Sequence, residues 1–405
     1  MNSETKRDKI ISVDRILLAV AGLLFAGISV ATIINDITPE WKYYQAEFKD
    51  YAAKVADEAA LDKIPSGIQQ IWAEDIDRVD RCITCHQGIF WPGLENAPQP
   101  YTTHPDLSIF ASHPAEDYGC SICHGGQGYS VDYLGAHGYV KFWEEPLLAA
   151  AVASDYNISE KNALVEINCN ICHRYERQTA GMEYINDAKN LIQDKACWGC
   201  HVINGSGGTI GPDLNYVGDK HAENLDWNNF SGFESVFNWH IMHFDEPAQI
   251  VPGTVMPKMG LQTRDRQALA MLMMSWKDTD FPTKYIPGFA QKEELRPEEK
   301  EKREKLLTGD GAFFIEKGCF VCHSVQAFGI ESPTEKGPDL TFALDDTRVR
   351  FRQTLQEFVF DPSQSGTMSI IFGAKIVLTD EEKWELINIL TKANHIYKTQ
   401  QDINN

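Results

Sequence analysis

The pentapeptide Cys197-Trp198-Gly199-Cys200-His201 places two cysteines and a histidine at a C-x-x-C-H spacing. The same spacing begins again at Cys82, Cys120, Cys169 and Cys319, so all ten cysteines of the 405-residue chain lie in five such motifs. A sequence of this composition would contain about 0.01 copies of the motif by chance. Chance therefore does not explain the pattern, and one chemistry should account for all five motifs.

The C-x-x-C-H spacing is typical of covalent haem attachment, in which two thiols form thioethers with the porphyrin and the histidine binds the iron. Structural zinc and disulfides are the alternatives. Zinc would pair the C-x-x-C units and leave one of the five over, and disulfides give no reason for a histidine after every second cysteine. We expect five haem c groups, attached at Cys82, Cys85, Cys120, Cys123, Cys169, Cys172, Cys197, Cys200, Cys319 and Cys322. The proximal iron ligands would be His86, His124, His173, His201 and His323.

Seven histidines remain once the five proximal ones are set aside, and three of them lie in loops among the first three motifs. These three are His104, His113 and His137. A histidine in a haem-rich loop is a good candidate for the second, distal ligand of an iron. We expect each of the three to serve one of the first three irons, although the sequence does not indicate which.

Methionines are expected as distal ligands of the last two irons. Met256 lies between Val255 and Pro257, and Met368 is the only methionine after Cys319. The alternatives to Met256 are Met259, His240 and His243. Three other methionines lie on a predicted helix and suit core packing better: Met271, Met273 and Met274.

This ligand count leaves no iron with an open position. Haem enzymes that act on small molecules keep one position vacant, so we expect electron transfer rather than catalysis by this chain alone. Methionine ligation raises the reduction potential of a haem relative to ligation by two histidines. Electrons should therefore pass from lower-potential haems in the first three motifs to higher-potential haems in the last two.

The charge of the chain limits its partners. Lys and Arg number 37 against 58 Asp and Glu, for a net charge of -21. Such a chain has no basic surface for phosphates, which excludes nucleic-acid binding as a main activity. An acidic surface favours a basic partner, and we expect a soluble, basic redox carrier.

The N-terminal region predicts a membrane anchor. The 19 residues from Ile16 to Ile34 carry no charge, which is nearly enough for a helix to cross a bilayer. Basic residues precede this stretch and acidic ones follow it, so the N-terminus should be cytoplasmic and the haem domains periplasmic. A cleaved signal peptide is the alternative, since Ser29-Val30-Ala31 resembles a weak cleavage site.

A second helix is expected from Glu40 to Leu61, because its apolar residues recur at three- and four-residue spacing. This helix would lie on its own domain or act as a stalk that docks on a membrane partner. The sequence does not separate the two possibilities.

The last two motifs are followed by similar signals. Cys197 to His201 leads to Gly211-Pro212-Asp213-Leu214 and a helical run from Thr263 to Trp276. Cys319 to His323 leads to Gly337-Pro338-Asp339-Leu340 and a helical run from Thr379 to Ala393. Both copies resemble the class I monohaem cytochrome c fold. The resemblance implies that the carbonyls of Pro212 and Pro338 accept a hydrogen bond from the proximal imidazole.

The first three motifs and their flanks resemble a trihaem module of multihaem cytochromes encoded with bacterial quinol-oxidising complexes. The matching segments are Cys82 to Ile89, Thr103-His104-Pro105, His113-Pro114, Gly119 to Gly128, Ala136-His137-Gly138 and Trp143 to Leu147. The resemblance implies a respiratory electron-transfer subunit whose partners are cytochrome b and Rieske subunits or those of an alternative complex III. A free-standing anchored relay, a donor subunit to a photosynthetic or terminal oxidase complex, and a catalytic multihaem enzyme remain as alternatives.

The sequence therefore predicts a mostly α-helical chain with much irregular loop. The expected parts are a cytoplasmic N-terminus and transmembrane anchor (1–38), a stalk helix and linker (39–75) and a trihaem module (76–184). They are followed by a monohaem cytochrome c domain (185–284), a charged linker (285–304) and a second monohaem domain (305–405).

Overall fold

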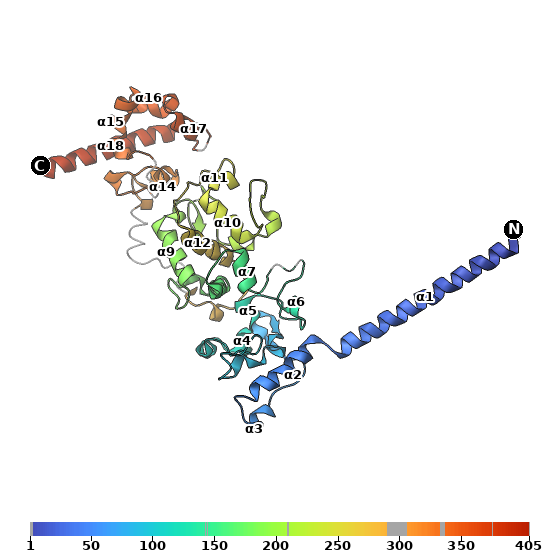
Figure 1. The fold of residues 1–405 in the computed structure, drawn as a ribbon. Helices are drawn as coiled ribbons and strands as arrows, with labels where there is room; N and C mark the ends of the chain where they lie inside the picture. Colours follow the sequence, from blue (N-terminus) through green and yellow to red (C-terminus); the bar gives the residue numbers. More distant parts are fainter. Residues whose placement is uncertain are drawn as a thin grey trace. The chain divides into compact units, whose positions relative to one another are not determined.

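The computed structural model describes residues 3–404 except 142, 144, 209, 290–305, 333–336 and 375. The described chain is mostly helical, with long irregular stretches between short helices (Figure 1). Its α-helices are α1 (Ser3–Ile37), α2 (Glu40–Ala52), α3 (Glu58–Leu61), α4 (Ala115–Tyr118), α5 (Ser121–His124), α6 (Tyr133–Ala136), α7 (Ala150–Asp155), α8 (Glu166–Cys172), α9 (Glu183–Asp194), α10 (Val236–Asp245), α11 (Pro247–Ile250), α12 (Thr263–Ser275), α14 (Ala312–Glu316), α15 (Ala343–Asp346), α16 (Leu355–Phe360), α17 (Gly366–Ala374) and α18 (Asp380–Asn404). Two small antiparallel hairpins pair β1 (Ile71–Ala73) with β2 (Arg78–Asp80) and β3 (Val202–Ile203) with β4 (Ser206–Gly207). Most of the charged linker predicted at 285–304 lies outside the described residues.

Helix α1 is one uninterrupted helix of 35 residues (Figure 1). Its segment Ser12–Ile34 is long and apolar enough to cross a membrane. Apolar side chains such as Leu18, Leu23 and Phe25 are about three-quarters exposed. A helix that exposes apolar side chains of this size is suited to a lipid environment.

The helix predicted from Glu40 to Leu61 is shorter in the structure, and that prediction was wrong at its C-terminal end. Helix α2 ends at Ala52. Helix α3 then begins after Asp57, whose carboxylate caps it by accepting the N–H of Ala60 at 2.8 Å. The cap satisfies a backbone donor that a continuous helix would pair internally, so it stabilises a separate start.

Helix α2 packs on its own domain. Phe48 and Ala52 are fully buried against a cluster that includes Ile64, Leu94 and Tyr101. The Tyr101 hydroxyl also donates a hydrogen bond of 2.6 Å to Glu47. The apolar face of α2 is therefore used inside the protein, which favours the first of the two possibilities left open by the sequence.

The chain forms two compact units, Met1–Leu147 and Leu148–Asn405. The first two motifs lie in the first unit, among short helices, 3-10 turns and the β1–β2 hairpin. The third motif lies in the second unit, on α8. The boundary between the units therefore falls inside the segment 76–184, and the grouping of three motifs as one module stays a prediction.

In the second unit, α12 packs against α8, α9 and α10 (Figure 1). Ile185, Met271 and Leu272 are fully buried at the centre of this core, and Met273 is nearly so. The prediction that these methionines fill the core is confirmed. A second core, built around Phe314, Phe320 and Leu390, joins α14, α16 and α18. The helical runs predicted to begin at Thr263 and Thr379 correspond to α12 and α18, and α18 continues beyond Ala393.

Candidate haem-binding sites

The first unit brings two pairs of histidine rings close together. The ring centroids of His86 and His137 lie 6.3 Å apart, with an angle of 64° between the ring planes. The rings of His124 and His104 are also 6.3 Å apart, at an angle of 73°. A metal–imidazole bond is about 2 Å long and the bonded nitrogen lies about 1 Å from its ring centroid, so two imidazoles on opposite faces of one metal have centroids about 6 Å apart. Both pairs fit this spacing.

Each of these pairs joins a proximal histidine of a motif to one of the predicted distal histidines. Burial, followed by the neighbouring His137 and His124, lowers the pKa of His86 to about 4. Burial also lowers the pKa of His124 and of His137. A low pKa keeps an imidazole neutral, which is the form that binds a metal.

Short contacts orient two of the distal candidates. His104 Nδ1 lies 2.7 Å from the backbone carbonyl and 3.2 Å from the backbone N of Asp106, and these contacts orient the ring and leave Nε2 for a metal. His113 Nδ1 lies 3.0 Å from the Ser112 hydroxyl, and the His113 ring packs edge-on against Tyr118. The structure places His104 beside His124 and His137 beside His86, and the distal-ligand roles of His104, His113 and His137 stay predictions.

The third motif has a feature that the sequence analysis missed. Nδ1 of its histidine, His173, lies 2.6 Å from the Glu176 carboxylate, which also accepts a hydrogen bond of 3.0 Å from Thr179. Burial acts to raise the pKa of Glu176, but the hydrogen bonds from His173 and Thr179 outweigh it and the pKa is lowered. A carboxylate on Nδ1 makes an imidazole a more basic metal ligand than a carbonyl does. The signal in the sequence was a glutamate three residues after the motif histidine.

The third motif is tied to the loops that follow the fourth. The buried guanidinium of Arg174 donates to the Asn204 side chain at 2.8 Å and to the Asn215 carbonyl at 2.7 Å. Inside the motif itself, Asn170 is fully buried and donates to Ser275 of α12 at 2.7 Å. The motif is thus built into the same core as α12.

The fourth and fifth motifs share one arrangement. Nδ1 of His201 lies 2.8 Å from the carbonyl of Pro212, and Nδ1 of His323 lies 2.7 Å from the carbonyl of Pro338. These are the two hydrogen bonds implied by the resemblance to class I cytochromes. The glycine before each proline is required, because a Cβ at Gly211 or Gly337 would overlap the imidazole ring. Backbone and imidazole therefore meet closely in both copies, as a fixed proximal ligand needs.

For these two motifs, the described part of the structure brings no predicted distal ligand into a contact as close as that of the proximal histidine. Met256 and Met259 are both half-buried, and the Met256 N–H donates to the Thr254 hydroxyl at 3.1 Å. His243 stacks on Trp239 at 4.9 Å, and burial, followed by the nearby His201, lowers its pKa to about 4. Met368 is half-buried on α17. Met256 and Met368 stay the predicted distal ligands, with the same alternatives to Met256.

The attachment loops of the fourth and fifth motifs pack against each other. Gly199 contacts the ring of Phe320 so closely that a Cβ there would overlap it, and a Cβ at Gly318 would meet Ile210 at 2.7 Å. Cys200 packs against the core that contains Phe320. The thiols of Cys200 and Cys322 are close enough to interact electrostatically. The two attachment loops are therefore in contact with each other near their cysteines.

No disulfide joins any of the ten cysteines, all of which lie in the described part of the chain and are at least partly buried. Burial is the first cause that raises the pKa of Cys85 and Cys200 to about 11 and of Cys197 and Cys319 to about 12. Among the described residues, no group of three or more His, Cys, Asp and Glu is arranged to hold a metal ion. The close glycines, the oriented imidazoles and the cysteines outside disulfides fit covalently attached haem.

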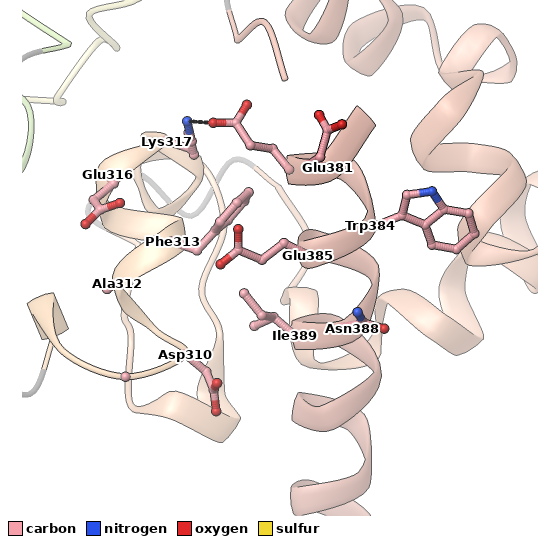
Figure 2. Close-up of a pocket in the computed structure, with 12 residues that line it drawn as sticks. Asp310, Ala312, Phe313, Glu316, Lys317, Glu381, Trp384, Glu385, Asn388 and Ile389 are labelled. Carbon is pink, nitrogen blue, oxygen red and sulfur yellow. Dashed lines mark hydrogen bonds and ion pairs between the residues drawn. The ribbon is translucent and has the colours of Figure 1, made fainter. Parts of the chain in front are cut away.

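A separate pocket lies between α14 and α18 (Figure 2). Phe313 and Ile389 line it together with acidic side chains, and Lys317 forms an ion pair with Glu382 at its edge. None of the predicted haem-binding residues is among its lining residues.

The comparison with protein families agrees with the geometry of the fourth motif. Residues 185–277 match the family model of cytochrome c. This segment is a cytochrome c domain. Haem c is the covalent cofactor of this family, and the domain supports an electron-transfer role for the chain. No curated protein and no solved structure matches the chain.

The cytochrome c domain contains α9, α10, α11 and α12 together with the fourth motif. Cys197 and Cys200 would hold the porphyrin, and His201 would bind the iron from the proximal side. Haem iron accepts and releases one electron, and the polypeptide sets its potential through the axial ligands and their hydrogen bonds.

Proposed function

We propose that this chain is a membrane-anchored electron-transfer subunit with five haem c groups. It would relay electrons from a quinol-oxidising membrane complex to an acceptor in the periplasm. The cytochrome c domain at 185–277 supplies the electron-transfer role, and the repeat of its motif predicts the other four haems. The apolar segment Ser12–Ile34 is the proposed anchor in the cytoplasmic membrane.

The observation that carries this proposal is the pairing of histidines in the first unit. His86 with His137 and His124 with His104 each show the 6.3 Å spacing of two imidazoles on one metal. Two protein ligands on an iron leave no position for a substrate, which favours outer-sphere electron transfer over catalysis. We therefore propose that the chain is an electron carrier and not an enzyme by itself.

The site contacts also support the proposed order of potentials. His173 has a carboxylate partner, whereas His201 and His323 have carbonyl partners. A more basic imidazole favours the oxidised iron, so it lowers the potential. The third haem would then be of lower potential than the last two, which are predicted to carry methionine.

The partners remain those implied by the trihaem resemblance: membrane cytochrome b and Rieske subunits, or those of an alternative complex III. A basic soluble carrier is the proposed acceptor, because the chain has a net charge of -21. Purification in mild detergent tests the donor end. Co-purified cytochrome b or iron–sulfur subunits would support the proposal, and a chain isolated alone would favour a free-standing relay.

Haem counting and carbon monoxide binding test the core of the proposal. Pyridine haemochrome analysis should give five haems per chain, and the fully reduced protein should bind no carbon monoxide quickly. His137→Ala should add one fast carbon monoxide-binding haem, because it removes the ligand opposite His86. His221→Ala is the matched control, since His221 is not a predicted ligand, and it should behave as wild type. Fewer than five haems, or fast stoichiometric binding by wild type, would contradict the proposal.

A further inference from the structure

Asp80 is a buried carboxylate between the first two haem motifs. It ends strand β2, two residues before Cys82, and its side chain is 1% exposed. Its Oδ2 accepts the backbone N–H groups of Cys120 at 2.6 Å and of Ser121 at 2.9 Å. One residue therefore joins the start of the first motif to the start of the second.

The fold leaves room for this carboxylate at two glycines. A Cβ at Gly119 would overlap Oδ2 of Asp80, and a Cβ at Gly128 would overlap Oδ1. Gly119 also has a φ of +71°, a conformation that most other residues adopt at a cost. Both glycines lie in the segment that surrounds the second motif, so the surrounding backbone is shaped around this side chain.

The surrounding hydrogen-bond donors satisfy only one of the two oxygens of the Asp80 carboxylate. Its Oδ1 is buried without a hydrogen-bond partner, and no salt bridge to Asp80 occurs among the described residues. Arg78, in the same strand, donates a weak hydrogen bond of 3.4 Å to the Ser121 hydroxyl, and Arg81, the next residue after Asp80, donates instead to Gln70 and to the Tyr129 carbonyl. Two N–H donors stabilise a negative charge, but burying a carboxylate without a paired cation lowers the free energy of unfolding. A role other than stability is needed to explain it.

Asp80 lies directly against the second motif. Its two N–H donors belong to Cys120 and Ser121, the first two residues of that motif. The Cys120 thiol in turn contacts Cys82, so the carboxylate lies where the cysteines of both motifs meet.

We propose that Asp80 is a positioning and tuning residue that lowers the reduction potentials of the haems at the first two motifs. A fixed negative charge stabilises the oxidised form of a nearby redox centre, and it acts strongly where water does not screen it. This inference rests on the proposed function, because it assumes haem at both motifs. The charge of Asp80 would lower the reduction potentials of the haems in the first unit independently of their axial ligands.

Spectroelectrochemical titration of Asp80→Asn tests the inference. The asparagine keeps an oxygen acceptor for the two N–H groups and removes the charge, so two of the five midpoint potentials should shift upward. The cytochrome c domain serves as an internal reference and should not shift. Asp77→Asn is the matched control: Asp77 is exposed in the same hairpin, its φ of 49° suits asparagine, and its removal should leave all five potentials in place.

The outcomes are distinct. Unchanged potentials in a five-haem Asp80→Asn protein, or equal shifts in both variants, would overturn the inference. If Asp80→Asn does not retain five haems, Asp80→Ser replaces it, because the serine also removes the charge and keeps an oxygen acceptor in a smaller side chain, and it should raise the same two potentials. No change in a five-haem Asp80→Ser protein would equally overturn the inference. Failure of the proposed function would appear separately, as a wild-type haem count below five or an iron open to carbon monoxide.

Discussion

At the scale of single residues, the proximal histidines differ in the group that holds Nδ1. His201 and His323 use the backbone carbonyls of Pro212 and Pro338, whereas His173 uses the side chain of Glu176. A carbonyl is neutral and a carboxylate carries a charge, so the three motifs have the same ligand atom but not the same ligand basicity.

Replacement of Glu176 tests this difference. Glu176→Gln keeps a hydrogen-bond acceptor for His173 and removes the negative charge. We expect an upward shift of the midpoint potential of one haem, measured by spectroelectrochemical titration, while the haem of the cytochrome c domain stays as in wild type. An unchanged potential would show that the carboxylate does not affect the iron.

At the scale of elements, α8 and α9 meet around a buried glutamate. Glu166 is 3% exposed on α8 and accepts the backbone N–H of Ile185 on α9 at 3.0 Å. Burial raises its pKa from 4.5 to about 7. Because the folded-state pKa lies above the unfolded one, ionised Glu166 opposes folding, and stability falls as the pH rises from about 4.5 through 7.

Glu166→Gln should remove this pH dependence. Above pH 7 the variant should be more stable than wild type, by up to about 3 kcal/mol, since one pKa unit corresponds to about 1.4 kcal/mol. The advantage should vanish below pH 4.5, where Glu166 becomes protonated in the unfolded as well as the folded state. Chemical denaturation across this range measures the effect, and Glu223→Gln, at an exposed glutamate outside α8 and α9, should show none of it.

A second element-scale feature is the contact between the attachment loops at Gly199 and Phe320. Gly199→Leu should push the loops apart, at a cost of about 1–3 kcal/mol for overpacking. The haem–haem signal in Soret circular dichroism should weaken while Soret absorbance is kept. Phe320→Leu in the same chain makes room for the new side chain and should restore much of the stability and of the Soret circular dichroism. A variant with unaltered dichroism would contradict a close pair of haems at this interface.

At the scale of the whole molecule, the proposed relay requires a gradient of potentials. The haems of the first three motifs should titrate below the two haems for which methionine is predicted, because of histidine ligation, Asp80 and Glu176. Spectroelectrochemistry of the full-length protein, with each haem identified by single-ligand variants, measures the order. If the two methionine-ligated haems had lower midpoint potentials than the other three, the proposed electron path would be contradicted.

Much of this protein could be predicted from its sequence, because the decisive motifs consist of residues close together in the chain. The C-x-x-C-H motifs, the uncharged N-terminal segment and the Gly-Pro segments are each contiguous. The first two indicate haem attachment and an apolar helix, and the Gly-Pro segments support the resemblance to class I cytochromes that implies the proximal hydrogen bonds. The helix break before Asp57 was missed, because the apolar spacing continues as far as Val55 and masks the cap.

Relations between distant residues were decided only by the tertiary structure. His137 stands opposite His86 and His104 opposite His124, although His104 is nearer in sequence to His86. The third motif joins the core of the second unit, and Asp80 meets Cys120 forty residues further along. The sequence lists the candidate ligands and carboxylates, but ligation and electrostatic tuning act over a few ångströms, and folding determines which groups come that close.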